Sequence, residues 1–312
     1  MNSSPDIICI GMALVDSIIK GFDPNPVSAS GYRAVSGSLN VGGEAVNEAM
    51  AAAKLGMKTG ILTSLGEDEA GDMIIAALKR CGVDTDLIIR SAQHPTPVTT
   101  MFVREDGTRK SVTNNAHHYN FHPEQYTDRF TDAKALLLGS LFRAPFDDPE
   151  IIHAVLQAAK RAGQTVFADT KLPNFRTLSL EDLAGSLEMI DYITPNEDEA
   201  KFYSGKQEPE AMADVFLEHG IRNVVIKLGG KGCFFKNAQG SLQLPPCKIK
   251  AVDATGAGDN FLAGFASEIL RSSTPQEALA FANACGAICT TAVGAATALK
   301  SREQVLQFMG RV

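Results

Sequence analysis

The order of apolar runs and amphipathic segments in the second half of the chain is the feature that most constrains the fold. Four apolar runs are typical of buried strands, and helix-like segments separate them. The predicted strands are 135–139, 165–169, 190–194 and 223–228, and the predicted helices are 149–161, 180–187, 196–203 and 209–219. Continuous apolar strands that alternate with helices indicate a parallel sheet covered on both faces. The sequence therefore predicts a doubly wound α/β fold with a mostly parallel sheet.

The first half of the chain predicts the first strand of this sheet and a smaller β-rich part. A short apolar run at 6–11 predicts a first buried strand, and the Ala-rich segment 44–55 predicts a helix. Two β-rich pieces, 96–103 and 109–113, are joined by a turn that contains Asp-Gly, a strong hairpin signal. Together with the irregular segment 21–42, this hairpin predicts a small sheet that projects from the main body.

Composition limits the partners and the compartment. A net charge of -7 and the lack of a basic run argue against a nucleic-acid partner, because phosphate contacts dominate that affinity. The stretch 278–299 carries no charged side chain, but its small residues predict a buried helix rather than a membrane span. The six cysteines form no CxxC pair, and no secretory signal is evident at the N-terminus. We expect a cytoplasmic protein.

A glycine-rich bend near the C-terminus is the strongest chemical signal. Gly256, Ala257 and Gly258 are small enough to let backbone N–H groups approach an anion, and the residues up to Ser267 resemble a helix. Asp259 follows the bend and could accept the proton of an attacking alcohol. A helix-capping Asp after a glycine-rich loop would have the same local sequence, so both interpretations stay open. No GxxxxGK[ST] phosphate loop occurs in the chain.

Four motifs resemble those of one family. The string DATGAGD, at 253–259, is similar to the C-terminal signature of the ribokinase-like (PfkB) family of carbohydrate kinases. Segment 42–47 resembles the family's glycine pair and sugar-contacting Asn, and 195–199 resembles its N-x-x-E motif. Segment 227–232 resembles the nucleotide-side T-x-G-x-x-G motif. The motifs follow the family order over nearly the whole chain, which is more specific than any one of them.

The resemblance implies an ATP-dependent kinase that phosphorylates a hydroxyl group of a small sugar or sugar derivative. It implies one ribokinase-like domain over residues 1–312, with helices on both faces of the sheet. A small β lid would come from roughly 12–38 and 91–115, and two lids would pack together in a homodimer. Lid closure would exclude water from the acceptor.

The resemblance also implies roles in the chemistry. Asp259 would be the general base, and the amides of Gly256, Ala257 and Gly258 would form the anion hole. Asn196 and Glu199 would act through water on the Mg²⁺ that accompanies the nucleotide phosphates. An N-cap with an acidic first turn is the competing interpretation of this pair.

On the acceptor side, the resemblance implies that four residues contact the sugar: Asp16, Gly42, Gly43 and Asn47. A surface loop is the alternative for Asp16. Lys171 and Arg176 follow a predicted strand and are plausible partners for substrate or transferring phosphate. Where ribokinases usually carry Lys after the glycine pair, this chain has Glu44, which argues against ribose itself.

On the nucleotide side, the resemblance implies roles for Lys227 and for Gly229 and Gly232, which would leave room for ribose and adenine. Asn283 matches a family position that lines the base pocket. Asp253 and segment 292–294 resemble loops that hold a monovalent cation, so potassium is an additional cofactor hypothesis.

Two other functions remain open from the sequence. One is a nucleoside or vitamin-precursor kinase of the same fold, and the other is a catalytically silent sugar-binding relative. The glycine pair, Asn47 and Asp16 favour a polyhydroxylated acceptor over the first alternative. The presence of Asp259 and the glycines argues against the second. The sequence does not identify the sugar or the hydroxyl that is phosphorylated.

Overall fold

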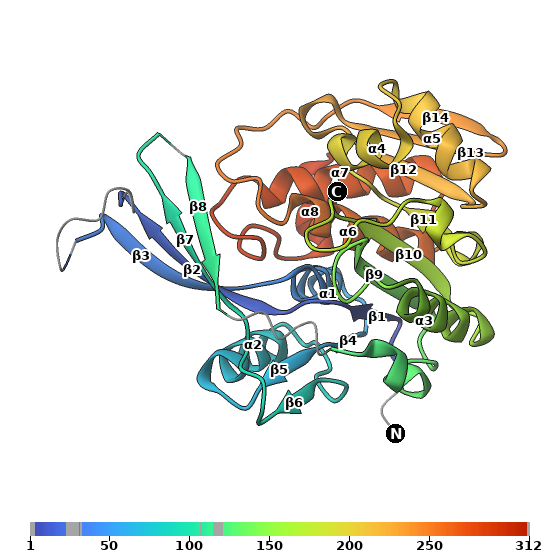
Figure 1. The fold of residues 1–312 in the computed structure, drawn as a ribbon. Coiled ribbons are helices and arrows are strands. Elements are labelled where there is room, and N and C mark those ends of the chain that lie inside the picture. Colours follow the sequence, from blue (N-terminus) through green and yellow to red (C-terminus); the bar gives the residue numbers. More distant parts are fainter. Residues whose placement is uncertain (1–3, 23–30, 32, 107, 115–120, 311–312) are drawn as a thin grey trace.

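An eight-stranded sheet forms the centre of the protein (Figure 1), as described by a computed structural model for residues 4–22, 31, 33–106, 108–114 and 121–310. Its strand order is β14-β13-β12-β11-β10-β9-β1-β4. The strands are β1 (Ile7–Ile10), β4 (Thr59–Leu62), β9 (Ala135–Leu141), β10 (Thr165–Thr170), β11 (Tyr192–Ile193), β12 (Asn223–Lys227), β13 (Cys233–Asn237) and β14 (Gly240–Leu244). All pairs from β4 to β12 are parallel, and β13 and β14 extend the sheet antiparallel. The predicted, mostly parallel sheet is confirmed.

Helices cover both faces of this sheet because successive side chains of a strand point to opposite faces. On β9, Ala135 and Leu137 join one hydrophobic cluster, whereas Leu136 and Leu138 join a second one. The first cluster includes residues of α1 (Glu44–Lys54), α2 (Glu69–Arg80), α6 (Ala257–Leu270), α7 (Pro275–Cys289) and α8 (Arg302–Phe308). The second includes residues of α3 (Pro149–Arg161), α4 (Glu197–Ser204) and α5 (Pro209–Glu218). The sheet is therefore doubly wound.

A smaller four-stranded sheet projects from the main body, at the left of Figure 1. Its order is β3 (Ser36–Gly42), β2 (Leu14–Lys20), β7 (Val98–Val103) and β8 (Arg109–Thr113). Only the β2–β7 pair in it is parallel. A separate pair joins β5 (Ser64–Gly66) and β6 (Ile89–Ser91). Positions 23–30, 32, 107 and 115 of the expected lid lie outside the described residues.

The two faces of the small sheet differ in polarity. Register aligns Leu39, Ser17, Thr100 and Val112 in one row, and Asn40, Asp16, Thr99 and Thr113 in the next. Rows that follow each other along a strand point to opposite faces. The Asp16 row faces the main body, since Asn40 Oδ1 lies 3.8 Å from where a Cβ on Gly294 would stand. The row of Leu39 and Val112 faces away from the body.

One expected helix is wrong. Segment 180–187 forms two short 3₁₀ turns, Glu181–Leu183 and Leu187–Met189, instead of an α-helix. Gly185 between them has φ 79°, a left-handed conformation that ends a helix. Leu183 and Leu187 are nevertheless buried, which explains the helix-like apolar spacing.

The uncharged stretch 278–299 is a buried, close-packed helix up to Cys289, and the chain that follows the helix is partly exposed at Thr291, Val293 and Thr297. It begins in α7, which starts with a capping box between Thr274 and Glu277. At Gly264 of α6, a Cβ would lie only 2.8 Å from Cys285 Sγ, so the two helices approach closely. None of the helices in the described part of the chain has the length and apolar character needed to cross a bilayer.

Candidate active site

The carboxyl ends of β10, β11 and β12 bring three polar residues together. Lys227 ends β12, and its Nζ lies 2.7 Å from both carboxylate oxygens of Asp169 on β10. Its backbone N–H donates to Pro195 at 2.8 Å, next to Asn196 after β11. The lysine side chain is 11% exposed and the aspartate 1%. Parallel strands end at one edge of the sheet, and ligands of open α/β sheets bind at that edge.

The glycine bend lies beside these strand ends. Gly256 has φ 76° and caps α6, and a Cβ there would overlap the Ala295 side chain. Asn260 fixes the bend by donating to the carbonyls of Gly256 at 2.8 Å and Ala295 at 2.9 Å. The Ala257 N–H donates to Ala254 at 3.2 Å. The first N–H groups of a helix, here including that of Gly258, have no acceptor within the helix and attract negative charge.

Asp259 stands in the first turn of α6 and is 5% exposed. Its Oδ2 accepts a 2.7 Å hydrogen bond from Asn47 Nδ2 on α1. Burial raises the pKa of Asp259, with Glu44 in the same direction, while Lys171 and the Asn47 bond oppose the rise. A buried carboxylate with a raised pKa at the end of an amide-rich bend is chemically suited to accept a proton.

Lys171 connects Asp259 with the acceptor side. Its Nζ is 3.9 Å from Glu44 Oε1. Burial alone would lower the pKa of Lys171, but the carboxylates of Asp259, Glu44 and Asp169 hold it above its ordinary value. The Tyr203 hydroxyl donates to the Lys171 carbonyl at 2.6 Å, which fixes the backbone of this residue. The ammonium therefore stays charged between the carboxylates.

Asn196 and Glu199 form a capping box at the start of α4. The Glu199 N–H donates to Asn196 Oδ1, and the Asn196 N–H donates to Glu199 Oε2, both at 2.9 Å. The Thr170 hydroxyl also donates to Glu199 Oε2, at 2.8 Å. Burial raises the pKa of Glu199, and Asp169 adds to this effect. The competing capping interpretation thus describes the local structure, and the pair still lies beside Asp169.

The glycine pair and Asp16, which the sequence predicts on the acceptor side, lie close together. A Cβ on Gly42 would lie 2.6 Å from Asp16 Oδ2, and Gly43 has φ 95° and caps α1. Burial raises the pKa of Asp16, followed by the negative charge of Glu44. Since α1 also carries Asn47, the glycine pair holds these polar groups at one helix end.

Two of the residues expected on the nucleotide side, Gly232 and Asn283, both lie against Pro245. Gly229 and Gly232 lie at a 3₁₀ turn after β12, with φ 56° and 95°. The Asn283 amide on α7 donates to the Pro245 carbonyl at 3.4 Å. Asp253 accepts a 3.0 Å bond from the Gly294 N–H, so the two segments expected at a cation site do meet.

Arg176 is not brought to the cluster. Its guanidinium lies 3.3 Å from the carboxylate of Asp148, the N-cap of α3, and is 54% exposed. Arg176 therefore lies at the surface, at the end of the loop that follows Lys171.

Sequence reasoning missed Glu48. Its carboxylate is fully buried on α1, and neither oxygen has a hydrogen-bond partner among the described residues. It lies against Gly139, where a Cβ would stand 2.9 Å from Glu48 Oε1. Burial raises the pKa of Glu48 well above its ordinary value, and Asp259 and Asp169 add to the rise. A Glu within an Ala-rich helix, four residues after Glu44, was the available signal.

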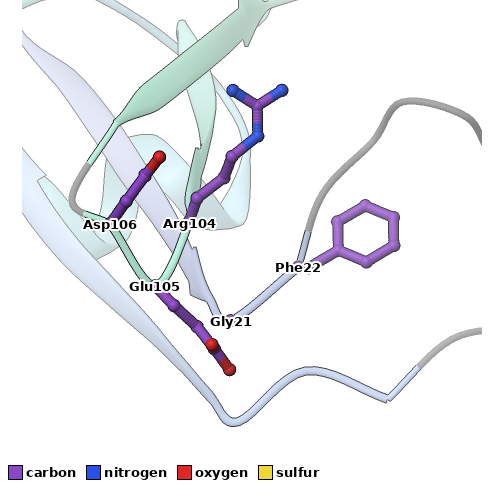
Figure 2. Close-up of a pocket in the computed structure, with 5 residues that line it drawn as sticks. All are labelled: Gly21, Phe22, Arg104, Glu105 and Asp106. Atoms are coloured by element: carbon purple, nitrogen blue, oxygen red, sulfur yellow. The ribbon is translucent and has the colours of Figure 1, made fainter.

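A hollow of about 360 Å³ lies elsewhere, at the turn of the small sheet. Its lining residues are Gly21, Phe22, Arg104, Glu105 and Asp106. Figure 2 shows their side chains pointing in different directions rather than converging on one point. A binding site requires convergent polar groups, so the Asp259 cluster is the better candidate.

The model of the pfkB family carbohydrate kinases matches residues 4–302. Ribokinase from Haemophilus influenzae is 30% identical over 273 residues, which cover 86% of this chain and 87% of that protein. The 2-dehydro-3-deoxygluconokinase from Bacillus subtilis is 30% identical over 285 residues, 87% of each chain.

Solved structures give the same result. Arabidopsis thaliana ribokinase complexed with ribose and ATP superposes with a TM-score of 0.87 at 26% identity, covering 98% of this chain and 99% of that one. A candidate ribokinase II from E. coli, in complex with ATP and Mg²⁺, has a TM-score of 0.81 at 25% identity, covering 99% and 100%.

The buried Glu48 carboxyl predicts a pH-dependent stability. With its pKa raised in the folded state, the folded protein keeps a proton that the unfolded chain loses above the ordinary Glu pKa. The free energy of unfolding therefore falls as pH rises, by up to about 1.4 kcal/mol per pH unit, until the folded pKa is reached. Glu48→Gln removes this slope. Between about pH 5.5 and 7.5, wild type should lose stability relative to the variant.

Urea denaturation at both pH values measures this difference. Glu69→Gln, at an exposed position of α2, is the matched control and should follow wild type. Parallel pH profiles for wild type and Glu48→Gln would contradict a protonated, buried Glu48.

Proposed function

Because the chain belongs to the pfkB family of carbohydrate kinases, we propose that the Asp259 cluster is where it phosphorylates a sugar hydroxyl with ATP. ATP-dependent sugar phosphorylation agrees with the relatives, which are ribokinases and a 2-dehydro-3-deoxygluconokinase. The observation that carries the assignment is the buried Asp259 carboxylate in the first turn of α6, directly after the glycine bend.

Asp259 acts as the general base in this proposal. Its Oδ2 is held by Asn47, and within the described part of the chain no hydrogen bond occupies Oδ1. Oδ1 takes the proton of the acceptor hydroxyl, whose oxygen forms a bond to the γ-phosphorus of ATP. The bond between that phosphorus and ADP breaks. Amides of the bend, that of Gly258 foremost, stabilise the negative charge of the phosphoryl group.

The residues present suit Mg²⁺. The described residues contain no group of three or more His, Cys, Asp or Glu side chains that could enclose a metal ion. Mg²⁺ commonly binds through one or two protein oxygen ligands, water and substrate phosphates, rather than in an all-protein cage. Glu199 and Asn196 supply oxygen donors, and because they already bond each other, contact through water is the consistent arrangement. When bound, the ion neutralises phosphate charge.

The acceptor side is polar throughout, which supports a polyhydroxylated substrate. Asp16, Asn47 and the backbone at Gly42 and Gly43 are the proposed sugar contacts. Asp16 lies on the inner face of the small sheet with Asn40 and Thr99. That sheet would act as a lid by moving its polar face over the bound sugar, which excludes water.

Nucleotide binding is proposed at the 3₁₀ turn with Gly229 and Gly232. Gly229 is exposed with positive φ and has no atom within 4 Å of where a Cβ would stand, which leaves space beside the strand ends, whereas Gly232 is buried against Leu244 and Pro245. Asn283 would line the base site. The cytoplasm is the proposed compartment, which six free cysteines support, since thiols persist in reducing surroundings.

Asp259→Asn should abolish turnover. Loss of a general base lowers kcat by about 10²- to 10⁴-fold, while the nucleotide, which contacts other residues, still binds. ADP release with hexoses, pentoses, sugar acids and polyols, and titration of the variant with ATP, measure the two effects. Asp72→Asn, also in a helix first turn but 71% exposed, is the control and should stay active. Near-normal turnover of Asp259→Asn would refute the assignment.

A monovalent cation is proposed between Asp253 and segment 292–294. The Asp253 carboxylate accepts bonds from the Thr255 and Gly294 N–H groups, which join the two segments. Replacing potassium with a large organic cation should lower the sugar-dependent rate of ADP release severalfold. Unchanged rates in both salts would remove this cation from the proposal.

A homodimer through the small sheet is proposed from its outer face. Leu39 and Val112 are 60% and 64% exposed and share one cross-strand row, and Val35 is 79% exposed. Exposed apolar side chains gathered on one face are typical of an interface.

Leu39→Asp should therefore convert a dimer into a monomer in sedimentation at micromolar concentration, because the charge would be buried in the interface. Gln243→Asp, at an exposed position on β14, should leave the dimer intact. A monomeric wild-type protein would contradict the proposed assembly.

A further inference from the structure

Lys227 touches the glycine bend as well as Asp169. A Cβ placed on Gly258 would lie 3.1 Å from Lys227 Nζ, so the ammonium lies directly against this backbone. Gly258 is in the first turn of α6, where the N–H groups point at any bound anion. The lysine and these amides are thus positive groups that converge on one place.

Positive groups repel each other unless an anion lies between them. In the structure, Asp169 provides that compensation, with both oxygens 2.7 Å from the ammonium. The carboxylate also accepts from the Thr194 hydroxyl at 3.2 Å and the Thr170 N–H at 2.9 Å, which fixes its position. Asp169 therefore holds the lysine in place rather than the reverse.

The backbone of Lys227 lies next to the proposed Mg²⁺ ligands. Lys227 forms an isolated β-bridge with Asn196. The Lys227 ammonium lies beside the Gly258 backbone, and its main chain pairs with Asn196, so one residue borders both groups proposed to contact the phosphates. Lys171, the lysine on the other side of Asp259, lies 3.9 Å from the Glu44 carboxylate, and the charges of Glu44 and Asp259 hold its pKa above the ordinary value.

We propose that Lys227 is a catalytic residue whose ammonium donates a hydrogen bond to the phosphoryl group during its transfer. This inference rests on the proposed function and deepens it. No proton leaves the lysine: the acceptor oxygen bonds to phosphorus, the bond to ADP breaks, and the hydroxyl proton goes to Asp259. The ammonium keeps its contact with Asp169 and offers a remaining N–H to the phosphoryl oxygens.

A purely structural ion pair is the competing explanation, because buried lysine–carboxylate pairs can often be replaced without loss of stability. Removing one partner or both separates the two explanations. The variants are Lys227→Met, Asp169→Asn and the double substitution, each measured for urea stability, kcat and KM for ATP and sugar.

Our proposal predicts that Lys227→Met lowers kcat by about 10²- to 10³-fold, the loss typical of one oxyanion donor. The KM for sugar should change little. The non-hydrolysable ATP analogue AMP-PNP should lose more affinity than ADP, because only the former carries a γ-phosphoryl group. Asp169→Asn should retain more than a tenth of the wild-type kcat, since the ammonium remains. The double variant should recover stability but keep the low kcat of Lys227→Met.

Two outcomes would overturn the proposal. One is a double variant that is as active as wild type, and the other is an Asp169→Asn variant as inactive as Lys227→Met. Lys160→Met is the matched control, since that lysine makes a 2.7 Å ion pair with Asp191 at the other end of the strands. It should lose stability without loss of kcat. Wild type and Asp259→Asn, assayed alongside, test the sugar kinase activity separately from the role of Lys227.

Discussion

The loss of hydration by carboxylates at the carboxyl edge of the sheet is the constraint on which the rest of the site depends. The carboxylates gathered there are Glu44, Glu48, Asp169, Glu199 and Asp259, and the cations among them are Lys171 and Lys227. Buried charge is unfavourable unless it is paired, protonated or hydrogen-bonded. Asp169 is paired with Lys227, Asp259 is bonded by Asn47 with Lys171 nearby, and Glu48 is left to bind a proton.

Prediction from sequence succeeded where a signal is local. The bend, the capping pair at Asn196 and the alternation of strands and helices depend on neighbouring residues. The contacts that give these motifs their chemistry are long-range: Asn47 meets Asp259 across 212 positions, and Lys227 meets Asp169 across 58. Such pairs depend on the order of strands in the sheet, which periodicity does not reveal. For the same reason, Glu48 looked like an ordinary helical residue.

Alternation along the strands gives the small sheet one polar face and one apolar face. Asp16 and Asn40 face the body, whereas Leu39 and Val112, one register step away, face outward. A shift of one residue in pairing would exchange these faces and place Leu39 over the acceptor side. At the base of the sheet, the missing side chain of Gly42 leaves room for the Asp16 carboxylate beside the backbone.

The position after the glycine pair departs from the pattern of ribokinases, and a nearby lysine compensates the added negative charge. Glu44 places a carboxylate where those relatives usually carry a lysine. Lys171, from the end of β10, brings its ammonium to within 3.9 Å of that carboxylate. A cation therefore lies near both Asp259 and Glu44, and it comes from the end of β10 rather than from α1. Local charge compensation of the base is preserved, whereas the groups offered to the sugar differ, so the acceptor must be identified by assay rather than by analogy with ribose.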